Sequence, residues 1–122
     1  MASGEGNYKA VLLLSSVCLD ALQESDQRSC KDLFECKRVA HVALDGADPE
    51  SYELRDKLFA ISGFRGIYPQ VFIEKFGNYE FVGLWGDVEH MNEMDDLPED
   101  LLTKHPEIKT FGAVFGGLVQ QR

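Results

Sequence analysis

The order of the apolar runs limits what this chain can fold into more than any other feature of its sequence. Residues 9–15 and 39–44 are short continuous apolar segments, which is typical of strands covered on both faces. Residues 70–74 and 79–83 are two further strand-like runs, and the Lys-Phe-Gly-Asn segment between them contains Gly and Asn, which accept positive φ. We therefore expect two separate strands followed by a hairpin.

Amphipathic segments between and after these strands predict three helices, over residues 20–37, 48–60 and 87–94. The first carries apolar residues at near-helical spacing, which are Leu22, Cys30, Leu33 and Phe34. The second begins with Asp48 as a candidate N-cap before a Pro, and the third has Asp87 as its candidate N-cap. The predicted order is β-α-β-α-β-β-α, which indicates an α/β protein.

The C-terminal residues predict further helix. Residues 98–102 and 106–115 each begin with Pro and acidic residues, as helices do. The second segment places three apolar residues on one helical face, which are Ile108, Phe111 and Phe115. We expect a flexible N-terminus over residues 1–8, a domain over 9–93, and a helical extension over 94–122 that packs on the domain. The alternative is an amphipathic tail that is free to bind a partner.

Charge narrows the classes of partner. The chain has 122 residues, the size of one domain, and a formal charge of −9. Seven of its 21 acidic residues lie within residues 87–100, so the other 14 nearly balance the 12 basic ones. An acidic chain without a basic stripe repels phosphate backbones and anionic lipid, so we expect neither nucleic acid nor a membrane as partner. We expect residues 87–100 to form a solvated acidic surface with no metal site.

The cysteines indicate a reducing compartment. The chain has Cys18, Cys30 and Cys36, an odd number with no Cys-x-x-Cys spacing and no His/Cys cluster at metal-ligand spacing. The first apolar run is too short for a secretion signal or a membrane span. We therefore expect a cytoplasmic monomer.

One proline connects the element order to a known fold. Pro69 stands directly before the third predicted strand, in the segment Ile-Tyr-Pro-Gln-Val-Phe-Ile of residues 67–73. This segment resembles the cis-proline stretch of glutaredoxin-like proteins. The resemblance implies a thioredoxin-like, three-layer α/β/α sandwich with a central four-stranded mixed sheet. It also implies a cis bond that turns the backbone of Tyr68 outward, to pair with an extended peptide such as glutathione.

Within that fold the chain resembles the SH3-domain-binding glutamic-acid-rich proteins, which are small glutaredoxin-like domains without the active-site cysteines. The similarity rests on residues 11–16, 68–73 and 77–83 and covers roughly residues 9–93. The loop before the third strand contains a single Pro, so the PxxP ligand for SH3 domains is missing. We therefore do not extend SH3 binding to this chain.

The resemblance also defines the candidate site. Where an active glutaredoxin has Cys-x-x-Cys, this chain has Cys18 alone, and Asp20 places a negative charge beside it that opposes thiolate formation. The expected groove for a peptide or glutathione consists of Arg65, Tyr68, Pro69, Gly83, Trp85 and Asp87. We therefore predict a binding module with no resident cofactor. The alternative is a monothiol, glutathione-dependent oxidoreductase that uses Cys18.

Overall fold

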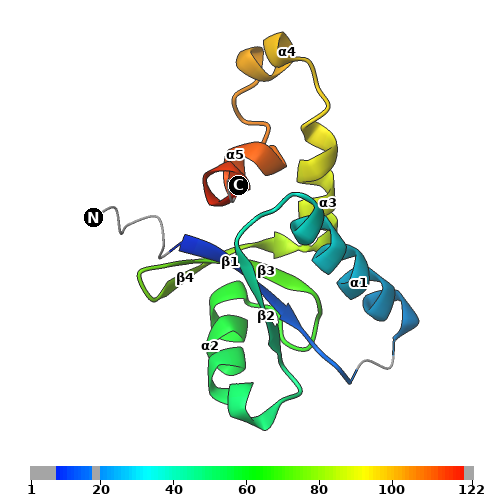
Figure 1. Cartoon of the computed structure of the whole chain (residues 1–122), viewed down its shortest axis with the longest axis vertical. Coiled ribbons are helices and arrows are strands. Elements are labelled where there is room, and N and C mark those ends of the chain that lie inside the picture. The colour runs from blue at the N-terminus through cyan, green and yellow to red at the C-terminus, as the bar shows by residue number, and fades with distance from the viewer. Residues whose placement is uncertain (1–7, 18–19, 120–122) are drawn as a thin grey trace.

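A four-stranded mixed sheet forms the centre of the protein. The computed structural model describes residues 8–17 and 20–119. The strands are β1 (Tyr8–Leu14), β2 (His41–Asp45), β3 (Gln70–Lys75) and β4 (Asn78–Leu84). Their order in the sheet is β2-β1-β3-β4, with β1 parallel to β2 and β3 antiparallel to both of its neighbours (Figure 1).

Helices cover both faces of this sheet. They are α1 (Ala21–Cys36), α2 (Tyr52–Ser62) after a 3₁₀ turn η2 (Pro49–Ser51), α3 (Trp85–Met94), α4 (Glu99–Lys104), α5 (Phe111–Phe115) and the 3₁₀ turn η3 (Gly116–Leu118). Helices α1 and α3 lie on one face and α2 on the other, which confirms the predicted thioredoxin-like α/β arrangement (Figure 1). Within the described residues, no helix is both long and apolar enough to cross a membrane.

Strand β1 explains why the sheet needs two helical layers. Its side chains alternate between the faces, so Ala10 and Leu12 join the core under α1 while Val11 and Leu13 join the core under α2. All four residues are at most 2% exposed. A strand that is apolar on both faces is stable only when both faces are covered, as its continuous apolar sequence predicted.

The C-terminal segment contributes side chains to the main core. Phe111 and Phe115 pack edge-to-face against Phe34 of α1, with ring centroids 5.4 and 5.0 Å away. Leu118 also joins this cluster, and its carbonyl accepts a hydrogen bond from Ala40 N at 2.9 Å. The end of the chain therefore closes the core beside α1 and α3, whereas α4 stands away from the sheet (Figure 1).

Two helix starts differ from those predicted. Residues 106–110 are not helical, and α5 begins at Phe111, where the Thr110 hydroxyl caps Ala113 N at 3.0 Å. Ile108 therefore lies outside the helix whose face it was expected to share. Asp87 is not an N-cap, because β4 runs directly into α3 and the helix starts two residues earlier, at Trp85.

The expected apolar face of α1 also begins later than predicted. Leu22 is 67% exposed, although its spacing placed it with the core residues Cys30 and Phe34, which are fully buried. Leu22 lies in the first turn of α1, and the buried part of that helix starts at Gln27.

We expect Phe115→Ala to lower the free energy of unfolding by about 3–5 kcal/mol, because the truncation leaves a cavity between α1 and α5. Chemical denaturation followed by circular dichroism measures this loss. Leu101→Ala, in the exposed helix α4, is the control and should change stability by less than about 0.5 kcal/mol. A loss below about 1 kcal/mol for Phe115→Ala would contradict the role of the C-terminal segment in the core.

Candidate functional site

The segments that form the candidate site meet at one end of the sheet. Gln70, the first residue of β3, pairs with Leu13 near the end of β1 and with Leu84 at the end of β4. Pro69 precedes Gln70 directly, so it lies close to the loop between β1 and α1 and to the junction between β4 and α3. The fold therefore brings three segments together that are distant in sequence.

The Tyr68–Pro69 peptide bond is cis, as the sequence indicated. The backbone N–H of Tyr68 donates a hydrogen bond to Gln23 Oε1 at 2.7 Å, so the first turn of α1 lies against the cis-proline. Sequence analysis missed Gln23, because a glutamine on a polar helix face carries no signal that distinguishes it from its neighbours.

The side chain of Tyr68 lies on the α2 side of the sheet. Its ring is tilted against Phe59 with centroids 6.1 Å apart, and a Cβ added at Gly46 would lie 3.1 Å from its hydroxyl oxygen. Burial raises the pKa of Tyr68, with Arg55 opposing the shift. The phenol ring of Tyr68 therefore packs near α2, and only the backbone of Tyr68 belongs to the expected groove.

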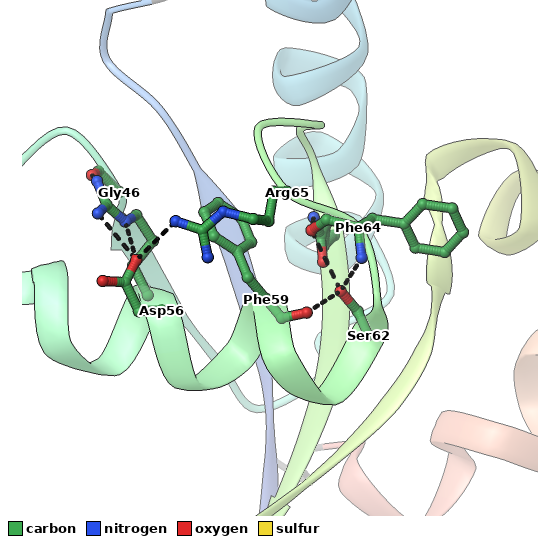
Figure 2. Close-up of polar contacts among 8 residues, drawn as sticks. Gly46, Asp56, Phe59, Ser62, Phe64 and Arg65 are labelled. Atoms are coloured by element: carbon green, nitrogen blue, oxygen red, sulfur yellow. Dashed lines mark hydrogen bonds and ion pairs between the residues drawn. The ribbon is translucent and has the colours of Figure 1, made fainter.

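A buried amide holds the loop that precedes the cis-proline. The side chain of Gln70 is fully buried, and its Nε2 donates to the carbonyls of Phe64 at 2.9 Å and Ile67 at 2.8 Å. At the start of the loop, Ser62 Oγ accepts a hydrogen bond from Phe64 N at 3.1 Å (Figure 2). The loop is therefore fixed at both ends.

Arg65 makes a surface ion pair on the α2 side. Its guanidinium lies 3.6 Å from Asp56 Oδ1 and 5.2 Å from the ring centroid of Phe59, as Figure 2 shows. The same carboxylate oxygen lies 2.9 Å from Arg55. Arg65, the basic residue of the expected groove, is thus already paired with an acidic residue of α2.

At the junction of β4 and α3, the side chain of Asp87 serves its own helix. Asp87 Oδ2 accepts a hydrogen bond from Leu84 N at 3.1 Å, which satisfies a donor at the helix start. A Cβ at Gly83 would lie 2.7 Å from Asp87 Cβ, so this close approach requires glycine. Trp85 packs against the core on the α1 side, so Trp85 and Arg65 lie on opposite sides of the sheet.

Polar contacts also fix the loop that would bear a nucleophile. Gln27, which is 8% exposed, donates from Nε2 to the Ser15 carbonyl at 3.2 Å and accepts from Ser15 N. The Asp20 carboxylate accepts from Leu22 N at 2.9 Å and so occupies a first-turn donor of α1. Cys18, the residue of the alternative enzymatic hypothesis, lies outside the described residues.

Two cysteines lie within the described part of the chain, and they differ in exposure. Cys30 lies on the buried face of α1. Burial raises the pKa of its thiol to about 12, so the thiol stays protonated and unreactive. Cys36, at the end of α1, is exposed. In residues 8–17 and 20–119, no group of three or more His, Cys, Asp or Glu side chains could hold a metal ion.

A hollow of about 550 Å³ lies between α1 and β2, and none of the residues of the expected groove lines it. Its floor includes Leu14 and Ala43, and charged side chains of α1 form its rim. Sequence analysis did not anticipate this hollow, although one signal was present. Ala43 is the small residue of β2 on the face that α1 covers, so the sheet there leaves space under the helix.

The chain matches no family model and no curated protein.

We expect acid to loosen the loop between β1 and α1 through Asp45. Its Oδ1 accepts from Ser16 N and from Ala47 N, both at 2.9 Å, and the bond from Ser16 is the main reason why the pKa of Asp45 is lowered. Because the pKa of Asp45 is lower in the folded state than its ordinary value of 3.8, the Asp45 carboxylate stabilises the fold at pH values above 3.8. This stabilisation is lost as the pH falls through the folded-state pKa.

Asp45→Asn should remove that part of the acid dependence of the unfolding free energy, measured by denaturation at a series of pH values. Asp96→Asn, which makes the same charge change at an exposed position after α3, is the control and should keep the wild-type profile. An Asp45→Asn profile that parallels the wild type would contradict this role.

Proposed function

We propose that this protein is a non-enzymatic, glutaredoxin-like binding module that takes an extended peptide segment at the cis-proline. One observation carries the proposal. The backbone N–H beside the cis-proline donates to the side-chain amide of Gln23 at 2.7 Å. An amide oxygen is chemically equivalent to a peptide carbonyl, so a ligand backbone can replace it.

Exposed apolar side chains next to this donor support a peptide ligand. Leu22 adjoins Gln23 in the chain and Ile67 adjoins Tyr68, and they are 67% and 40% exposed. Val17, in the loop before α1, is 69% exposed. An extended segment that pairs with the Tyr68 backbone would cover such side chains with its own alternating apolar residues. The partner class is therefore a protein segment with apolar side chains.

The polar groups of the site favour binding over redox chemistry. A reactive thiolate at the start of α1 would need the free N–H groups and the positive end of that helix. The Asp20 carboxylate takes one of these N–H groups and brings a negative charge. Cys18 has no second cysteine three positions along the chain, where position 21 is Ala, to resolve a mixed disulfide. These features support a module that is not an enzyme.

Glutathione is a weaker candidate than a longer peptide. The two charged residues of the expected groove are Asp87 and Arg65, and they already bond to Leu84 N and to Asp56. A ligand that relies on backbone pairing and apolar contacts needs neither of them. We therefore propose no resident cofactor, and we propose the reducing cytoplasm as the compartment because a buried Cys30 and an exposed Cys36 remain free thiols.

We expect Gln23→Ala to tighten peptide binding, because the ligand no longer competes with an internal acceptor for Tyr68 N. A hydrogen bond of about 0.5–1.5 kcal/mol corresponds to a gain of roughly two- to tenfold in affinity. The probes are heptapeptides selected against the wild type from a displayed random library, and calorimetry gives their affinities.

Ser25→Ala, on the exposed surface of the same helix, is the matched control and should keep the wild-type affinity. Peptide binding should also move the backbone amide resonance of Tyr68 in nuclear magnetic resonance spectra. If no selected peptide moves that resonance, the proposed binding mode is wrong.

The enzymatic alternative makes the opposite prediction in a glutathione-dependent disulfide reductase assay. We expect turnover no faster than the uncatalysed exchange between glutathione and a small mixed disulfide, for the wild type and for Cys18→Ser alike. Turnover that Cys18→Ser abolishes and Cys36→Ser preserves would overturn the proposal of a non-enzymatic module.

A further inference from the structure

Strand β2 is an edge whose outer hydrogen-bonding groups are open. Ala10 N donates to the Ala40 carbonyl, and Gly46 N donates to the Leu14 carbonyl, so residues 42 and 44, which lie between these two bonds, turn their backbone groups toward β1. The N–H and C=O groups of His41 and Ala43 and the N–H of Asp45 therefore point away from the sheet. In the described part of the chain, β2 pairs with β1 alone.

The two edges of the sheet differ in how they are protected. Edge strands commonly avoid pairing with other chains through a bulge or charged side chains. Strand β4 pairs with β3 across a register shift at Val71 and Phe72, and it carries the exposed Glu80. Strand β2 pairs in an uninterrupted register, and its Val42 is 43% exposed. The unprotected edge is thus the one beside the hollow.

We propose that this edge binds the β2 edge of a second copy of the same chain, in place of the monomer expected from the sequence. An antiparallel pair centred on Ala43 is self-complementary. Ala43 exchanges both backbone hydrogen bonds with Ala43 of the second copy, and Asp45 N lies opposite the His41 carbonyl. On the α2 face, the exposed Val42 lies opposite Leu44 of the second copy, which is an apolar pair.

Four charged side chains of α1 can pair with those of a second copy across a two-fold axis. The rim of the hollow above Ala43 includes Arg28, Lys31, Asp32 and Glu35, and the ion pairs of the described residues involve none of them. An axis that passes between Lys31 and Asp32 sets Arg28 opposite Glu35 of the second copy and Lys31 opposite Asp32. Both signs of charge therefore meet their opposites in one arrangement, which selects a second copy over an unrelated peptide.

Sedimentation equilibrium of the full chain tests the proposal at protein concentrations up to about 0.1 mM, where micromolar association is complete. We expect a mass of twice 13.7 kDa for the wild type. Ala43→Pro removes an N–H that faces outward, and Val42→Lys adds a charge to the edge, so each should give a monomer. Ala60→Lys, on the exposed surface of α2, is the matched control and should remain dimeric.

A monomeric wild type overturns the proposal, as does a dimer that persists in both β2 variants while circular dichroism shows them folded. A wild type that stays monomeric and binds a peptide at β2 also overturns it, in favour of a foreign segment.

Charge reversal tests the two-fold register separately. One variant combines Arg28→Glu with Lys31→Glu, and a second combines Asp32→Lys with Glu35→Lys. Each alone sets like charges opposite each other and should associate at least tenfold more weakly than the wild type. Their mixture restores opposite charges at all the paired positions and should form a heterodimer. A mixture that stays monomeric while the wild type is dimeric would overturn the proposed register.

Discussion

The burial of β1 on both faces is the constraint on which the rest of the structure depends. Residues 10–13 are almost completely inaccessible, and they alternate between the two cores. A strand of this kind forces helices onto both faces, and short parallel pairing with β2 forces α1 to cross one of them. The hairpin of β3 and β4 pairs with the remaining side of β1, which places the start of β3 beside the loop after β1.

Three glutamine side chains turn that end of the sheet into a defined site. Gln27 holds the loop after β1, Gln70 holds the loop before the cis-proline, and Gln23 joins α1 to Tyr68. Each amide bonds to backbone groups that no strand or helix satisfies, and buried backbone groups need such partners. Because neutral amides fix the loops on either side, the proposed ligand carbonyl would replace the contact at Gln23 without unfolding a loop.

The sequence was most informative where a residue's environment follows from local pattern. The strands and the two-sided burial of β1 were predicted, because alternation and apolar runs act over a few residues. The cis bond before Pro69 was expected from the resemblance of residues 67–73 to glutaredoxin-like proteins. The bond from Tyr68 to Gln23 joins residues 45 positions apart, so no local pattern contains it. The prediction of Asp87 as the N-cap of α3 was wrong because the start of this helix depends on where β4 ends, which the local sequence does not show.

The positions of the cis-proline site and of the outer edge of β2 are related through the sheet. A two-fold axis through Ala43 reverses the strand direction, so in the proposed dimer the two cis-proline sites lie at opposite ends of one continuous eight-stranded sheet. Each cis-proline site lies at the strand ends, whereas the dimer contact runs along the side of β2. The two sites are therefore separate from each other and from the dimer contact. Such a dimer holds two independent sites that face away from each other. It therefore favours partners that carry two apolar segments far enough apart to reach both ends, and it gains affinity for them through effective concentration rather than through new contacts.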